Sequence, residues 1–149
     1  MIIYKQGDVI KALENGEINL LPHGCNCRKV MGSGIAKSLA TKYPKILEYD
    51  RNFPPILEAR LGRIVKVPID KEKFIINCYT QLNYGAGLQV DYNAIEKCMK
   101  ALNNLLNLSD KYVLGMPQIG AGRGGGDWKK IETIINNEIE REIYVFIYK

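Results

Sequence analysis

The stretch that decides the fold of this chain spans Gly24–Ala36 and reads GCNCRKVMGSGIA. It follows an apolar run over residues 18–23 that is typical of a buried strand, and a helical pattern comes after it. A second glycine-rich stretch, PQIGAGRGGGDW, spans Pro117–Trp128. Glycines let backbone N–H groups approach a ligand closely, and a helix N-terminus adds partial positive charge. Two such turns in one small domain predict a ligand with two phosphates.

The spacing of apolar residues outside these turns alternates between strand-like and helix-like. Strands are predicted over residues 2–5, 18–23, 61–69, 74–80, 111–117 and 143–148, and helices over 9–14, about 33–52, 92–106 and 127–139. Pro44 is expected to kink or interrupt the second helix. The last strand has no polar face, which indicates an interior position in the sheet.

This alternation, after an antiparallel element at the start, predicts an α/β fold. We expect a three-layer α/β/α sandwich with a mixed central sheet. In such sheets ligands bind at the C-terminal ends of the strands, and both glycine-rich turns fall at strand ends.

Composition is that of one ordinary domain over residues 1–149, with 46% hydrophobic and 25% charged residues. The net charge of +5 favours anionic partners, but the lysines are scattered, so a nucleic-acid partner is not expected. The sequence shows no apolar run of membrane-spanning length and no secretory signal, so we expect a cytoplasmic protein without membrane contact, and a monomer. The four cysteines are Cys25, Cys27, Cys78 and Cys98, and their spacing does not match that of zinc ligands, so no metal site is expected. Without a secretory signal they are expected to be reduced. No cofactor is expected either.

Taken in order, four motifs resemble those of the macrodomain family, whose members bind ADP-ribose and its derivatives. They are KQGDV at Lys5–Val9, a strand ending in Asn26, MGSGIA at Met31–Ala36, and PQIGAG at Pro117–Gly122. The resemblance covers essentially the whole chain. The stretch HGCNC at His23–Cys27 points to the yeast-type ADP-ribose 1''-phosphate phosphatase and the related terminal ADP-ribose glycohydrolase branch.

The resemblance implies a set of ligand-binding residues. Asp8 would accept a hydrogen bond from the adenine amino group, although it is equally suited to capping the helix that follows. Asn26 would lie near the distal ribose, and the two turns would hold the diphosphate, with Arg123 adding a permanent charge. The full predicted set is Gly7, Asp8, Val9, Asn26, Met31, Gly32, Ser33, Gly34, Ile35, Gln118, Gly120, Ala121, Gly122, Arg123 and Gly124. Three tyrosines are left open as pocket or core residues: Tyr79, Tyr84 and Tyr92.

The resemblance also implies a catalytic pair, because yeast-type members require a histidine and pair it with an aspartate. His23 is the only histidine, and it could donate a proton to a leaving oxygen or act as a nucleophile. Asp91 is the best match for its partner and Asp127 is the rival, and both also look like helix N-caps. The glycohydrolase branch instead uses a lysine, expected near residues 80–83, and an aspartate where Gly124 stands here; this sequence has neither.

The sequence therefore predicts an ADP-ribose-binding macrodomain that converts ADP-ribose 1''-phosphate to ADP-ribose and phosphate. Three alternatives stay open. The first is a binding module without turnover, and the second is a hydrolase that removes ADP-ribose from protein or nucleic acid. The third is a basic nucleic-acid-binding domain, which would bind DNA or RNA with a steep salt dependence and would not respond to ADP-ribose.

Overall fold

The computed structural model describes residues 1–54, 56–85, 87–122 and 124–148. The strands are β1 (Ile2–Gln6), β2 (Leu20–Asn26), β3 (Ile64–Asp70), β4 (Lys73–Gln81), β5 (Gly115–Met116) and β6 (Ile143–Ile147). The helices are α1 (Val9–Asn15), α2 (Gly34–Lys42), α3 (Lys45–Asn52), α4 (Leu57–Arg60), α5 (Tyr92–Leu106) and α6 (Trp128–Glu138). None of the helices in these ranges is long and apolar enough to cross a membrane.

The strands form a mixed sheet in two halves, ordered β1-β6-β5 and β2-β4-β3. The halves meet where Leu20 and Leu114 form a parallel bridge. β1 pairs parallel to β6, β6 to β5 and β2 to β4, whereas β3 and β4 form an antiparallel hairpin. The expected antiparallel element at the start of the chain is therefore wrong: β1 passes into α1 and pairs with the last strand in the same direction.

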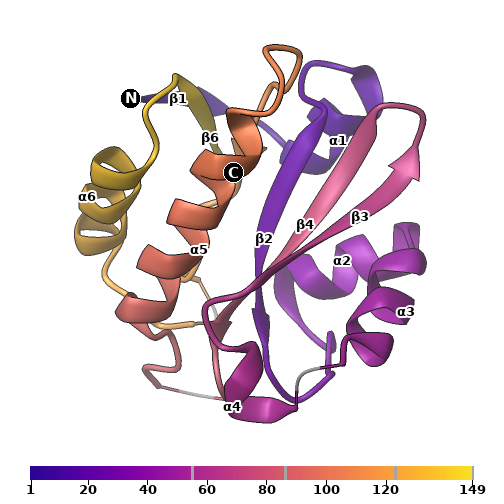
Figure 1. Ribbon diagram of the computed structural model, residues 1–149, viewed down its shortest axis with the longest axis vertical. Coiled ribbons are helices and arrows are strands. Elements are labelled where there is room, and N and C mark those ends of the chain that lie inside the picture. Colours follow the sequence, from indigo (N-terminus) through magenta and orange to yellow (C-terminus); the bar gives the residue numbers. More distant parts are fainter. Residues whose placement is uncertain (55, 86, 123, 149) are drawn as a thin grey trace.

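Helices cover both faces of the sheet, as predicted for a three-layer sandwich (Figure 1). One apolar core lies between the sheet and α5 and α6, with buried residues such as Ile95, Met99 and Ile131. The other lies between the sheet and α1, α2 and α3, with Leu13, Leu39 and Ile46. Each of these five helices contributes one apolar stripe to its core, which is why periodicity located them in the sequence.

Two predicted elements differ in length from the observed ones. The long second helix is divided, because Pro44 cannot continue an α-helix, and α2 ends at Lys42 before α3 begins at Lys45. The strand predicted over 111–117 shrinks to Gly115–Met116. Pro117 has no N–H to donate to a ladder, which ends the strand there.

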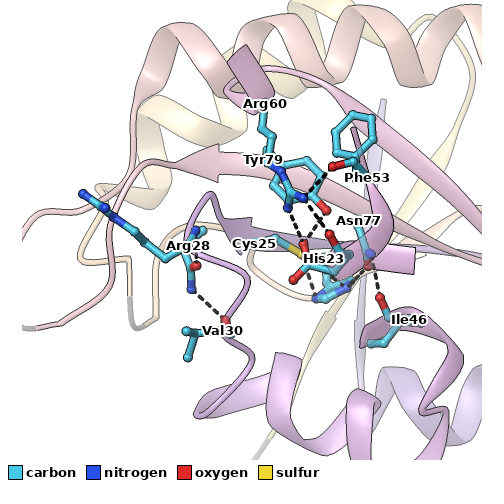
Figure 2. Close-up of polar contacts among 11 residues, drawn as sticks. His23, Cys25, Arg28, Val30, Ile46, Phe53, Arg60, Asn77 and Tyr79 are labelled. Carbon is cyan, nitrogen blue, oxygen red and sulfur yellow. Dashed lines mark hydrogen bonds and ion pairs between the residues drawn. The ribbon is translucent and has the colours of Figure 1, made fainter. Parts of the chain in front are cut away.

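A buried ion pair fixes α3 and α4 to the sheet. Arg60 is fully buried, and its guanidinium donates to Asp50 Oδ1 at 2.9 Å and to the backbone oxygens of Asp50 and Phe53 at 2.7 and 2.8 Å. The Tyr79 hydroxyl donates to the same carboxylate at 2.5 Å, and Arg60 stacks against the rings of Phe53 and Tyr79 (Figure 2). Burial and the adjacent carboxylate raise the pKa of Tyr79 far above its ordinary value, so it stays a donor.

Candidate functional site

The two glycine-rich turns lie along one continuous hollow at the C-terminal ends of β2 and β4. A cavity of about 280 Å³ is lined by Ser33–Ala36 of the first turn and by six residues of the second: Pro117, Gln118, Ile119, Gly120, Gly122 and Gly124. A neighbouring cavity of about 470 Å³ extends over the first turn and the loop after β4. The two share Gly24, Ser33, Ala36 and Gln81 as lining residues. The predicted convergence of the turns is confirmed.

The first turn is organised by Asn26, which ends β2 and lines the larger cavity. Its Nδ2 donates to the Val30 carbonyl at 2.8 Å, and its Oδ1 accepts from the Arg28 N–H at 2.9 Å. These bonds fold the chain back over itself and leave one amide hydrogen of Asn26 free of the turn. Asn26 thus both shapes the turn and presents its amide to the cavity.

The first turn ends at the N-terminus of α2, which lines the smaller cavity. Ser33 is the N-cap, but its side chain makes no capping hydrogen bond, unlike the aspartates that cap α1, α5 and α6. The N–H groups of residues 34–36 find no acceptor in the described part of the chain. An uncapped helix N-terminus that borders a cavity is suited to binding an anion.

The second turn is a tight backbone structure that only glycine can form at two positions. Gly120 has φ +77°, and a Cβ there would lie 2.9 Å from Val90 Cγ2. A Cβ on Gly124 would lie 2.7 Å from the Gly120 carbonyl oxygen. The Gly124 carbonyl accepts from the N–H groups of Gln89 and Val90 at 2.8 and 3.1 Å, which ties the turn to the segment before α5. The glycines here serve close packing of the backbone.

The sequence reasoning missed two residues at the end of β4. Gln81 lines both cavities and Thr80 lines the smaller one. Tyr84, in the following loop, lines the larger cavity with 59% of its surface exposed. Of the three tyrosines left open, only Tyr84 lines the cavities; Tyr79 is buried, and the Tyr92 hydroxyl accepts from the Asp127 N–H. A signal for Thr80 and Gln81 existed, because they end a strand parallel to β2 at the same sheet edge.

Some predicted ligand residues are not at the cavities. Gly7 and Asp8 join β1 to α1, and Val9 is the first residue of α1; none of the three is among the described residues that line either cavity. Asp8 Oδ1 accepts from the Ile10 N–H at 2.9 Å, so it caps α1. Ala121 packs partly against the core instead of lining a cavity. Arg123 lies outside the described residues. The remaining predicted ligand residues do line the hollow: Asn26, Met31, Gly32, Ser33, Gly34, Ile35, Gln118, Gly120, Gly122 and Gly124.

The predicted catalytic His23 is enclosed in the protein interior. Its imidazole has no exposed surface, and Nε2 lies 2.7 Å from Asn77 Oδ1, whose amide nitrogen donates to the Ile46 carbonyl at 3.1 Å (Figure 2). Because an amide oxygen only accepts, Nε2 carries the proton. Burial lowers the pKa of His23 to about 4, partly opposed by the Asn77 contact. A buried, neutral imidazole outside both cavity linings does not support the predicted catalytic role.

The predicted partner of His23 is not beside it either. Asp91 is the N-cap of α5, and its Oδ1 accepts from the Ala94 N–H at 3.0 Å. The rival Asp127 caps α6 in the same way, through the Lys129 N–H at 3.0 Å. Over the described ranges, no hydrogen bond or ion pair joins His23 to either carboxylate. Both aspartates are held by helix ends, whose unpaired N–H groups they satisfy.

Cys25 is the one thiol among the described lining residues of the cavities, and it lies 3.6 Å from His23 Nε2. It is almost fully buried, and burial raises the pKa of the Cys25 thiol well above its ordinary value. A thiol held protonated in this way is a poor nucleophile.

The family model for the Macro domain matches residues 23–135, more than half of the chain. The chain belongs to the Macro domain family. A 17.5 kDa protein of Enterobacteria phage T4 is 34% identical to this macrodomain, over 91% of this chain and 88% of the relative. An ADP-ribose 1''-phosphate phosphatase of Saccharomyces cerevisiae is 26% identical over 90% of each chain. A DNA ADP-ribosyl glycohydrolase of Mycobacterium tuberculosis is 28% identical over 89% of this chain but only 37% of its own length.

Solved structures agree with this assignment. The macrodomain of Thermus aquaticus DarG superposes on this macrodomain with a TM-score of 0.77 at 20% identity, covering 100% of this chain and 98% of that one. Thermosipho africanus DarTG, solved in complex with ADP-ribose, gives a TM-score of 0.76 at 13% identity, covering 99% of this chain and 41% of that one. At these identities the likeness establishes the macrodomain fold, and the homologues with named activities are hydrolases of ADP-ribose derivatives.

Proposed function

We propose that this macrodomain binds ADP-ribose or an ADP-ribose derivative in the hollow between its two glycine-rich turns. One observation carries the proposal: the uncapped N-terminus of α2 and the second glycine turn line the same cavity. Their backbone N–H groups offer neutral donors and a positive helix end to a diphosphate without a competing carboxylate among the described lining residues. The volumes of the two cavities suit a ligand of nucleotide size.

In this proposal the diphosphate lies in the smaller cavity and the distal ribose lies in the larger one. Asn26 and Gln81 project there and can bond to ribose hydroxyls, since an amide both donates and accepts. The adenine end stays a prediction from the family resemblance, with Asp8 as its acceptor although Asp8 lines neither of the two cavities. Asp8 lies between the end of β1 and the start of α1, and β1 is a strand of the same sheet, which is compatible with that role.

The candidate reaction is dephosphorylation of ADP-ribose 1''-phosphate. The support is that the yeast relative with this activity matches over nearly its whole length, whereas the glycohydrolase of Mycobacterium tuberculosis contains much sequence beyond the match. Among the described residues, the lining of both cavities holds no Asp, Glu, His, Lys or Arg. Catalysis would therefore rest on backbone amides that stabilise developing charge and on side-chain amides that orient water.

Calorimetric titration with ADP-ribose tests binding. Gly122→Val is the informative variant, because a Cβ on Gly122 meets no protein atom within 4 Å and the added side chain enters the ligand's space. We expect affinity to fall by about tenfold or more with little change in thermal stability, since the ligand loses about 1.4 kcal/mol or more of contact. Asn104→Ala, on the exposed side of α5, is the control and should bind as wild type. Equal affinity for Gly122→Val and wild type would contradict the proposed site.

Turnover separates the candidate reactions. Phosphate release from ADP-ribose 1''-phosphate supports the phosphatase, and ADP-ribose release from modified DNA or protein supports a glycohydrolase. Neither release, with ADP-ribose binding intact, leaves a binding module. His23→Gln should not change the outcome, because that residue lies outside the cavity linings.

A further inference from the structure

Thr80, which lines the smaller cavity, carries a hydroxyl group without a hydrogen-bond partner. The residue is fully buried. Among the buried side-chain nitrogen and oxygen atoms in the described part of the chain, the Thr80 hydroxyl is the only one without a partner. The Thr80 carbonyl, by contrast, accepts a hydrogen bond from the Asp91 N–H at 2.8 Å. A buried hydroxyl without a partner destabilises the folded state, because it has lost its hydrogen bonds to water without replacing them. Such a cost in a native protein calls for a reason.

The position of the hydroxyl indicates what it lacks. Thr80 lines the cavity that both glycine-rich turns share, and its Oγ1 lies 2.9 Å from where a Cβ on Gly24 would stand. Gly24 lines both cavities and has no side chain to cover the hydroxyl, so the hydroxyl lies beside bare backbone at the cavity wall. The same cavity receives the uncapped N-terminus of α2. A further donor at this place would complete a set of neutral donors around one anion.

We propose that the Thr80 hydroxyl is a ligand-binding donor that hydrogen-bonds to an oxygen of the diphosphate, and that it stays unpaired until the ligand enters. This inference rests on the proposed function and names one contact within it. The free protein carries the unpaired hydroxyl at a cost in stability, and the ligand supplies the acceptor. A hydrogen bond to a charged acceptor is stronger than one between neutral groups, which favours the diphosphate over a ribose hydroxyl.

The test compares Thr80→Val, which keeps the shape and removes the hydroxyl, with Thr80→Ser, which keeps the hydroxyl. Titrations use ADP-ribose and ADP, because both contain the diphosphate and only ADP-ribose contains the distal ribose. We expect Thr80→Val to weaken both ligands by a similar factor of about 10 or more, the loss typical of a hydrogen bond to a charged group. Thr80→Ser should keep affinity within a factor of about 3. The melting temperature of free Thr80→Val should equal or exceed that of wild type.

Each contrary result has its own meaning. If wild type binds no ADP-ribose, the proposed function fails and this inference fails with it. If wild type binds and Thr80→Val binds equally well, the function stands and the Thr80 contact is refuted. Equal losses in the valine and serine variants would assign the effect to packing, and a loss for ADP-ribose alone would place the contact outside the diphosphate; both overturn the inference. A lower melting temperature for Thr80→Val would show that the hydroxyl already has a partner, and would overturn it too.

Discussion

Lowering the pH is predicted to destabilise this macrodomain through His23. Burial lowers the pKa of His23 in the folded chain to about 4, whereas an unfolded chain has the ordinary value of 6.5. Above pH 6.5 the imidazole is neutral in both the folded and the unfolded state, so protonation of His23 takes nothing from the free energy of unfolding. Between 6.5 and about 4 the unfolded state binds a proton that the folded state does not, so stability falls as the pH falls.

The size of the effect follows from these two pKa values. At about 1.4 kcal/mol for each unit between them, His23 removes about 3 kcal/mol from the free energy of unfolding across this window. The reference is His23→Gln, whose amide can still donate to Asn77 Oδ1 but does not titrate. Carboxylates also titrate in this pH range, but both proteins contain the same carboxylates. The difference between the two proteins therefore removes the carboxylate contribution to the pH dependence.

The assay is urea unfolding of both proteins at several pH values between about 7 and 4. We expect the free energy of unfolding of wild type to fall by about 3 kcal/mol more than that of His23→Gln. Parallel pH profiles would refute the reasoning, because they would mean that His23 titrates alike in both states. Parallel profiles would also make His23 a catalytic candidate again, since an imidazole that titrates normally is accessible to water.

Two further predictions concern stability. Arg60→Met leaves the buried Asp50 carboxylate without its cation, so it should lower the free energy of unfolding in urea by about 3–5 kcal/mol. The control Arg51→Met, on the exposed side of α3, should lower it by at most about 0.5 kcal/mol. A loss below about 1 kcal/mol for Arg60→Met would mean that the ion pair is solvated. Gly120→Ala forces a side chain into φ +77° and into packed apolar groups, so it should cost about 1–3 kcal/mol by thermal unfolding, whereas Gly122→Ala, which meets no atom, should cost little. Equal melting temperatures for these two glycine variants would contradict the close packing of the second turn.

Much of the fold could be predicted from local patterns. The N-caps at Asp91 and Asp127 and the apolar stripes after them located α5 and α6, and Pro44 marked the break between α2 and α3. These features act over a few residues, within one turn of helix, so the sequence carries them without help from the rest of the chain. The direction of β1 could not be predicted, because it depends on pairing with β6 at the other end of the chain.

The sequence by itself determined that two glycine-rich turns follow strand ends, and through them the Macro domain family and the class of ligand to test. Only the tertiary structure decided which polar side chains reach the hollow. β2 and β4 are buried on both faces, so alternation along them cannot separate a side chain that faces the cavity from one that faces the core. His23 pairs with Asn77 on the neighbouring strand, and Asn77 is held in turn by the Ile46 carbonyl of α3, so the imidazole stays in the interior. The bare backbone at Gly24 leaves the Thr80 hydroxyl at the cavity wall.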